Sequence, residues 1–345
     1  MVPMSGVVMV APERFIDTGA WFRIERDGSA GAVRRAAEAL ARQMQFDGGR
    51  VADVAIVAAE LATNLIKHAD DGALLLRPLR YESCAGVELI SIDSGPGMAD
   101  LALSARDGHS TAGTLGIGLG AIARQASRLD GYSRPGRGTV LAVQIWPQQP
   151  EPPAWAGGLV RPLTGETVSG DGFAVRQVAG RRQVLVSDGL GHGPLAAAAT
   201  AAAISAFHTA PAAGPAQVVE YLHRAMSHTR GAAVAVAELD SASATLRYAG
   251  LGNITGRITG DGTSRGLVSL PGIAGHQRRS VREYDYPLGA GALLVMHSDG
   301  VADRWQLDDY PGLLGHSPVV IAATVLRDAA VRRDDACVVV VPAEE

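Results

Sequence analysis

The first 147 residues alternate between amphipathic helices and short apolar strands. Over residues 50–69, apolar side chains recur every three or four positions, which predicts a helix with one buried face. A serine before the periodic positions of 29–44 predicts a second, capped helix. A third helix is expected over 120–129, and strands over 20–27, 73–81, 87–93 and 139–146. This order predicts an α+β sandwich, one sheet with helices on one face.

The pattern changes after residue 159 to a series of short apolar strands. We expect them over 172–180, 182–188, 233–240, 244–252, 292–299 and 336–342. Three helices are expected between or after them, over 194–209, 215–229 and 317–331. Helices that interrupt runs of antiparallel strands predict two packed sheets with helices outside, an αββα sandwich.

A segment rich in proline and glycine separates the two patterns. The sequence "WPQQPEPPAWAGG" (146–158) can continue neither a helix nor a central strand. We therefore predict two domains, 1–147 and 160–345, joined by a proline-rich linker over 148–159.

Composition and charge narrow the class of protein. The formal net charge of −4 is spread along 345 residues, which argues against nucleic-acid binding because that requires a basic surface. Only Cys84 and Cys337 are present, so a disulfide framework is not expected. The N-terminus lacks the basic start of a signal peptide, and the Ala-rich stretch 195–207 is too short to cross a membrane. We expect a soluble cytoplasmic protein that binds no membrane.

Three polar residues share one side of the helix over 50–69. Glu60, Asn64 and Lys67 lie four and three positions apart, so they project on the same side. From the helix alone, a solvated face is the more frequent explanation. Asn64, however, is a poor residue for the middle of a helix, and coordination of Mg²⁺ by its side-chain oxygen would give it a reason to be there.

Two glycine clusters follow this helix. Asp93 ends a strand and precedes Gly95 and Gly97, and a second cluster stands just before the helix at 120: Gly113, Gly116, Gly118 and Gly120. Glycines before a helix N-terminus let backbone N–H groups approach phosphates. The spacing fits neither a Walker loop nor a dinucleotide fingerprint.

Taken in order, these segments resemble the GHKL ATPase family over about residues 20–147. "ELATNLIKHA" looks like the N box, "DSGPG" the first glycine box and "GTLGIGLGA" the second. The resemblance implies ATP and Mg²⁺ as cofactors, with Asp93 accepting from the adenine amino group, Asn64 holding Mg²⁺, Glu60 as general base and the glycines 113–120 lining the triphosphate. A short segment 98–112 and no preceding helix with a phosphoacceptor histidine favour the small serine-kinase branch similar to RsbT and RsbW.

Acidic residues mark strand ends in the second half. Asp188 and Asp299 each follow an apolar run and precede glycine, Asp171 begins a strand, and Asp334 and Asp335 precede the last strand. Each could be an ordinary turn residue. If their side chains converge in the fold, the gathered carboxylates need cations or hydrogen-bond donors beside them. Carboxylates without clustered Cys or His suit Mg²⁺ or Mn²⁺ better than Zn²⁺, and two such ions activate a water for attack on phosphorus.

The order "SGD…VSDGLGHG…HSDG…RDDACVVVV" resembles the PPM family of metal-dependent phosphatases, nearest its SpoIIE-like and RsbX-like branch. The resemblance covers about residues 160–343. It implies two Mn²⁺ or Mg²⁺ ions held by these groups: Asp188 as the bridge, the Gly189 carbonyl, Asp299, Asp334 and Asp171. Asp335 would be a bystander. His192 is either a catalytic acid or a turn residue, and a third metal stays open.

The two resemblances together predict a bifunctional regulator. An N-terminal protein serine/threonine kinase and a C-terminal metal-dependent phosphoserine/phosphothreonine phosphatase would act on STAS-domain partners of a partner-switching pathway that controls a sigma factor. The alternative is a phosphatase whose N-terminal domain only binds ATP or a partner and regulates it. An inactive phosphatase that serves as a scaffold for a kinase is a third reading. The sequence leaves the oligomeric state open.

Overall fold

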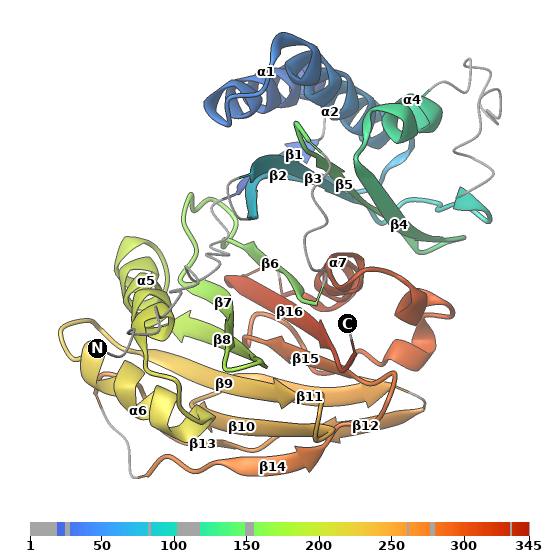
Figure 1. The fold of residues 1–345 in the computed structure, drawn as a ribbon. Helices are drawn as coiled ribbons and strands as arrows, with labels where there is room; N and C mark the ends of the chain where they lie inside the picture. Colours follow the sequence, from blue (N-terminus) through green and yellow to red (C-terminus); the bar gives the residue numbers. More distant parts are fainter. Residues whose placement is uncertain are drawn as a thin grey trace, which may run out of the picture.

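The computed structural model describes residues 19–24, 28–81, 84–101, 118–148, 155–260, 262–276, 280–331 and 333–344. Three β-sheets and six main helices in these residues form a stack of layers (Figure 1). Among the described residues, no helix is long and apolar enough to span a bilayer. The α+β two-domain class predicted from the pattern is confirmed.

The N-terminal part is one antiparallel sheet, called sheet 1, in the order β1-β2-β3-β5-β4. The helices α1, α2 and α4 cover one of its faces (Figure 1). Sheet 1 and these helices comprise β1 (Ala20–Ile24), α1 (Gly28–Gln43), α2 (Gly48–His68), β2 (Gly72–Tyr81), β3 (Cys84–Ile92), α4 (Gly118–Gln125), β4 (Arg128–Arg134) and β5 (Gly138–Ile145).

Helix α2 forms where the apolar period predicts it. The Asp47 side chain caps its N-terminus by accepting from the Arg50 backbone N–H at 3.0 Å. Its buried face, which includes Val54, Ala58, Leu61 and Leu65, packs on sheet 1. The opposite side keeps Glu60 and Asn64 partly accessible.

The predicted helix over 120–129 is wrong beyond Gln125. The backbone N–H of Ser127 donates to Gln144 O of β5 at 2.8 Å, and strand β4 begins at Arg128. The residues of β4 include Asp130, Gly131 and Ser133, which favour a helix interior poorly. The strand lies at the edge of sheet 1, where its polar side chains were not recognised as a strand pattern.

The C-terminal part contains two sheets. Sheet 2 runs β13-β10-β9-β8-β7 with β14 beside β10, and sheet 3 runs β12-β11-β15-β16-β6. Sheet 2 comprises β7 (Asp171–Val178), β8 (Arg181–Gly189), β9 (Ala232–Asp240), β10 (Thr245–Leu251), β13 (Ser269–Leu270) and β14 (Tyr284–Pro287), and sheet 3 comprises β6 (Gly157–Arg161), β11 (Thr255–Gly260), β12 (Thr263–Gly266), β15 (Leu293–His297) and β16 (Ala336–Pro342).

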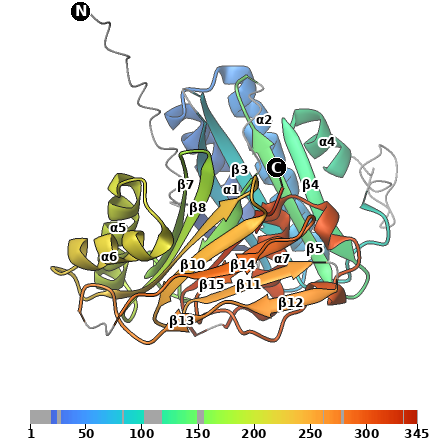
Figure 2. The ribbon, with the colours of Figure 1, turned by 60° about the horizontal axis from the view of Figure 1, so that its bottom comes forward.

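Helices lie on the outside of this pair of sheets. α5 (Pro194–Thr209) and α6 (Pro215–Ala225) cover sheet 2, and α7 (Pro318–Ala329) covers sheet 3. The view of Figure 2 shows α5 and α6 side by side, away from α1, α2 and α4. The sequence pattern did not predict five short or polar strands, namely β6, β11, β12, β13 and β14. β6 begins at Gly157, inside the predicted linker, because it pairs with β16.

Helix α7 also packs against sheet 1, on the face that α1, α2 and α4 leave open (Figure 1). Leu75, Ile90 and Tyr132 of sheet 1 share one buried cluster with Val320 and Leu326 of α7. The layer order is therefore helices, sheet 1, α7, sheet 3, sheet 2, helices. The sequence pattern did not reveal that one helix serves two sheets.

Candidate functional site

The acidic strand ends of the C-terminal part come together where sheets 2 and 3 meet. Asp171 of β7 lies directly opposite Asp188 of β8 in the antiparallel register, so both side chains project on the same face of sheet 2, and Asp188 acts electrostatically on Asp171. Asp299 follows β15 and Asp334 precedes β16, and these two strands are paired neighbours. Asp299 and Asp334 both act electrostatically on Asp188, so the four acids form one charged cluster.

Burial and mutual repulsion change how these acids ionise. Burial, followed by the charge of Asp188, raises the pKa of Asp171 well above its usual range. Burial, followed by the charges of Asp299 and Asp334, raises the pKa of Asp188 to about 7. Burial, followed by the charge of Asp299, also raises the pKa of Asp334. The cluster therefore resists holding all its negative charges without a cation.

Ser298 joins the two sheets at the cluster. Its hydroxyl donates to Asp171 Oδ2 and accepts from the Cys337 backbone N–H at 3.0 Å. Its backbone N–H donates to Cys337 O at 3.1 Å. Ser298 thus fixes Asp171 on β7 relative to β16. Sequence reasoning missed this serine, although its place directly before Asp299 was a usable signal.

Asn253 and Asp335 are two further polar residues at the cluster. Asn253 Nδ2 donates to Asp299 Oδ2 at 2.6 Å, and this contact was not predicted. Asp335 accepts from the backbone N–H groups of Leu163 and Gly170, both at 2.7 Å. Those two bonds use both carboxylate oxygens to hold a loop. Asp335 therefore has a structural position, in keeping with its reading as a bystander.

The glycines after the acids are required by close backbone approach. A Cβ atom on Gly300 would lie 1.7 Å from Asp335 O, and one on Gly189 would lie 2.3 Å from Ala196 O. Neither space can hold a side chain. Gly189 and Gly300 let the chain that follows Asp188 and Asp299 pack against neighbouring backbone. This close packing requires glycine more strictly than the turn predicted from Asp-Gly alone.

His192 lies at the exposed edge of the cluster. Its Nδ1 is 3.2 Å from Glu166 Oε1, and its side chain is 60% exposed. Its proximity to Asp334 helps to offset the raised pKa of that carboxyl group. The position places an imidazole beside the acids, but its described partner is Glu166.

The residues fit a hard divalent cation. Carboxylates are the preferred ligands of Mg²⁺ and Mn²⁺. Within the described parts of the chain, no three His, Cys, Asp or Glu side chains are arranged as a finished metal site. Ion binding would therefore require the side chains of these acids to move into coordination geometry.

A second predicted site lies on sheet 1 at the end of β3. Asp93 Oδ1 accepts from the Gly95 N–H at 2.8 Å, and its backbone pairs with Thr139 of β5. Burial raises the pKa of Asp93, against the opposing effect of the Gly95 bond. Gly97 has a φ of +65°, and a Cβ there would lie 2.0 Å from Arg134 O. The turn after Asp93 is therefore shaped by glycine.

Helices α2 and α4 meet beside this turn. A Cβ on Gly118, the first residue of α4, would lie 3.0 Å from Glu60 Oε2 and 3.3 Å from Asn64 Oδ1. Gly120 is buried within α4. The structure thus brings Glu60, Asn64 and Gly118 together, and their roles toward a nucleotide stay predictions. Gly113 and Gly116 lie outside the described residues.

Comparison with known proteins relates each half of the chain to a known domain family. Residues 25–145 match the family model described as a histidine kinase-like ATPase domain, and residues 179–343 match that of stage II sporulation protein E (SpoIIE). The chain joins a histidine kinase-like ATPase domain to a SpoIIE phosphatase domain. The N-terminal residues are called the ATPase domain below, and the C-terminal ones the SpoIIE domain.

Individual proteins and solved structures are similar to parts of this chain. The serine/threonine-protein kinase RsbT of Bacillus subtilis (strain 168) is 28% identical over 124 residues, which cover 36% of this chain and 93% of that kinase. One solved chain is 28% identical to this one. Its structure is described as "The bacterial stressosome: a modular system that has been adapted to control secondary messenger signaling". Its TM-score is 0.50, and the match covers 54% of this chain and 97% of that one. RsbX in complex with magnesium is 21% identical, with a TM-score of 0.47 over 54% of this chain and 94% of its own.

Proposed function

We propose that the SpoIIE domain is a metal-dependent phosphatase that acts on phosphoserine and phosphothreonine in a partner protein. The observation that carries this proposal is the gathering of Asp171, Asp188, Asp299 and Asp334 at one junction of two sheets. No nucleophilic serine or cysteine is needed, because two bound Mn²⁺ or Mg²⁺ ions would supply an activated water and polarise the phosphoryl group.

Each residue of the cluster has a distinct proposed part. Asp188 and the Gly189 carbonyl would hold metal, together with Asp299, Asp334 and Asp171. Ser298 orients Asp171 and Asn253 orients Asp299 through the hydrogen bonds described above. His192 stands where it could protonate the leaving serine oxygen or contact the substrate.

We propose that the ATPase domain binds ATP with Mg²⁺ and phosphorylates serine or threonine on a partner. Asp93 would accept from the adenine amino group, and Asn64 would hold Mg²⁺. Gly95, Gly97, Gly113, Gly116, Gly118 and Gly120 would border the nucleotide. Glu60, which lies beside Asn64 and Gly118, would take the proton of the attacking hydroxyl. The similarity to RsbT, a serine/threonine-protein kinase, supports this part.

The proposed partner is a phosphorylatable STAS-domain protein of a partner-switching pathway. Both the RsbT similarity and the likeness to a chain from the bacterial stressosome support this class. One chain would then add and remove phosphate in the same pathway. Because the two reactions together would only consume ATP, we expect one activity to be suppressed while the other runs.

The test is hydrolysis of p-nitrophenyl phosphate and of a phosphoserine peptide by the full chain, with Mn²⁺ and with EDTA. Asp188→Asn should abolish the metal-dependent turnover. Asp240→Asn is the matched control, because Asp240 is a carboxylate at the far end of β9 from the cluster. Turnover that persists in Asp188→Asn, or that ignores EDTA, would refute the phosphatase assignment.

A second candidate is favoured by the contact of α7 with both domains. In this candidate the ATPase domain binds ATP or a partner only in order to regulate the phosphatase. A Glu60→Ala variant separates the two candidates. If the wild type transfers phosphate from ATP to the partner and Glu60→Ala does not, the domain is a kinase. If the wild type transfers no phosphate and Glu60→Ala keeps the effect of the wild type in cells, the domain is a binding module.

A further inference from the structure

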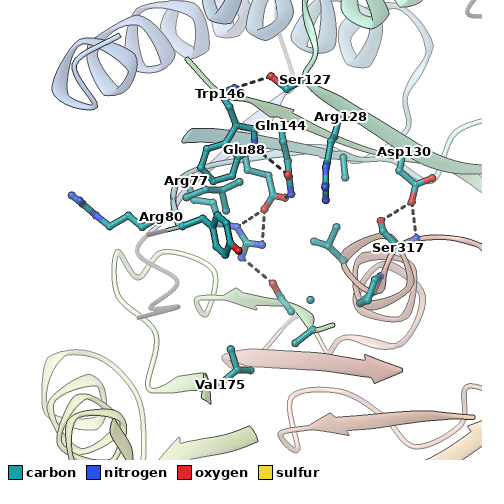
Figure 3. A pocket seen from close by; sticks show the side chains of 18 of the residues that line it. Arg77, Arg80, Glu88, Ser127, Arg128, Asp130, Gln144, Trp146, Val175 and Ser317 are labelled. Carbon is teal, nitrogen blue, oxygen red and sulfur yellow. Dashed lines mark hydrogen bonds and ion pairs between the residues drawn. The ribbon is translucent and has the colours of Figure 1, made fainter. Parts of the chain in front are cut away.

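Asp130 of the ATPase domain caps a helix of the SpoIIE domain. Asp130 Oδ2 accepts from the backbone N–H of Ser317 at 2.7 Å and from its hydroxyl at 2.6 Å (Figure 3). Asp130 Oδ1 lies 2.8 Å from His316 Nδ1. Ser317 is the N-cap residue of α7, and its own side chain makes no capping bond within the helix. The acid that satisfies this helix end comes from the other domain.

The position suits a carboxylate. The positive end of the α7 dipole and the His316 ring both favour a negative charge at Asp130. Burial works to raise the pKa of Asp130, but the hydrogen bonds from His316 and Ser317 outweigh it and lower the pKa. A cavity of about 490 Å³ opens beside this contact, between β4 and β5 on one side and β6 and α7 on the other. The contact between Asp130 and Ser317 therefore borders a cavity between the two domains and is not enclosed by close packing on that side.

The other end of α7 holds the loops of the acidic cluster. Ala329 O accepts from the Ala302 N–H at 2.9 Å, and the Val331 N–H donates to Gly300 O at 2.7 Å. Gly300 directly follows Asp299, and Asp334 is three residues beyond Val331. The loop that carries Asp299 is thus bonded to the last turn of α7 and to Val331 just beyond it, and Asp334 follows on the same chain segment.

Between its two ends α7 is closely packed. Ten of its side chains are buried, and eight of these belong to one cluster with residues of sheet 1 and sheet 3. Packed interiors deform little, so a shift at one end of such a helix is passed to the other end. The helix is about 18 Å long, as expected for twelve residues at about 1.5 Å each.

We propose that Asp130 is a positioning residue of the phosphatase centre, acting across the domain boundary through α7 on Asp299 and Asp334. The ATPase domain would then be a structural part of the metal centre. This inference rests on the proposed metal site. Through α7, a structural change in the ATPase domain would reach the acidic cluster of the SpoIIE domain.

The test compares Asp130→Ala with Trp21→Phe in the full chain. Trp21 Nε1 donates to Val160 O at 2.7 Å, so Trp21→Phe removes another hydrogen bond between the domains, one that ends on β6 and not on α7. Mn²⁺ binding is measured by calorimetry, and hydrogen exchange is followed in peptides that contain the Ala302 and Val331 amides. We expect Asp130→Ala to weaken Mn²⁺ binding about tenfold and to speed exchange at both amides. Trp21→Phe should stay within about twofold of the wild type in both.

Equal effects of the two variants, or unchanged binding and exchange in Asp130→Ala, would overturn the proposal. If circular dichroism shows that Asp130→Ala does not fold, Asp130→Asn takes its place, because the amide keeps an acceptor oxygen but loses the charge. A wild type that binds no Mn²⁺ would refute the proposed function and not the coupling, since the exchange comparison still decides whether Asp130 controls the far end of α7.

Discussion

Asp171 and Asp188 lie directly opposite each other on the paired strands β7 and β8, and Asp188 acts electrostatically on Asp171. Two ionised carboxylates at this position would repel each other, so the pair must keep a proton or gain a cation. This single relationship links the fold to the proposed metal dependence. It also makes the stability of the metal-free protein sensitive to pH.

We expect the metal-free protein to lose stability as the pH rises. The folded pKa of Asp188 is raised to about 7 by burial and by Asp299 and Asp334, whereas an unfolded aspartate has a pKa of about 4. A raised folded pKa gives stability that is complete below the unfolded value and is lost as the pH rises through the folded one. Thermal unfolding in EDTA between pH 4 and 8 measures it.

The matched variant for this experiment is Asp188→Asn, which cannot ionise. Its melting temperature should fall less than that of the wild type over the same pH range. Added Mn²⁺ should restore the wild type at pH 8 but have little effect on the variant. Parallel pH profiles for the two proteins in EDTA would show that the cluster is not strained as described.

Ser298→Ala should destabilise the protein by about 1–3 kcal/mol, the usual cost of leaving buried polar groups without a partner. The change removes the donor to Asp171 and the acceptor of the Cys337 N–H. Urea unfolding measures the effect, with Ser205→Ala on the exposed side of α5 as the control. A Ser298→Ala protein as stable as this control would argue against the serine as the link between the sheets.

Gly300→Ala should disrupt the cluster more severely than any single polar substitution. A methyl group there would meet Asp335 O at 1.7 Å, so the loop that carries Asp299 must move. We expect a large loss of melting temperature and of Mn²⁺ binding. Gly315→Ala is the control, because a methyl group there meets no atom within 4 Å. Similar behaviour of the two variants would contradict the close packing at Gly300.

Asp93→Asn should weaken ATP binding by at least about tenfold, because an amide replaces one carboxylate acceptor oxygen with a donor. Binding can be followed with a fluorescent ATP analogue in the full chain. The control is Asp71→Asn, an exposed residue paired with Arg23 at 3.2 Å. Equal affinity of Asp93→Asn and the control would remove Asp93 from the nucleotide site.

The sequence pattern predicted the fold class and most of the central elements, because their apolar periods are long or clear. It failed where packing and not local pattern decides the structure. Strand β4, read partly as helix, exists because Ser127 turns the chain onto β5. The role of α7 between two domains could not be predicted, since a helix buried on two sides shows no unusual period.

For the sites, residue type and order were sufficient to predict which acids and glycines to examine. Asp188 and Asp299 stand out because each ends an apolar run. Asn253, Ser298 and Asp130 could not be singled out in this way, because their importance depends on atoms that are distant along the chain. The assignments of individual ligands and catalytic groups stay predictions until they are tested by substitution.

The most direct test of the central claim is a calorimetric titration of the full chain with Mn²⁺, beside Asp188→Asn and Asp240→Asn. We expect the wild type and Asp240→Asn to bind two ions at the acidic cluster, and Asp188→Asn to lose this binding. Binding that is the same in all three proteins, or absent from the wild type, would contradict a metal centre built on Asp171, Asp188, Asp299 and Asp334.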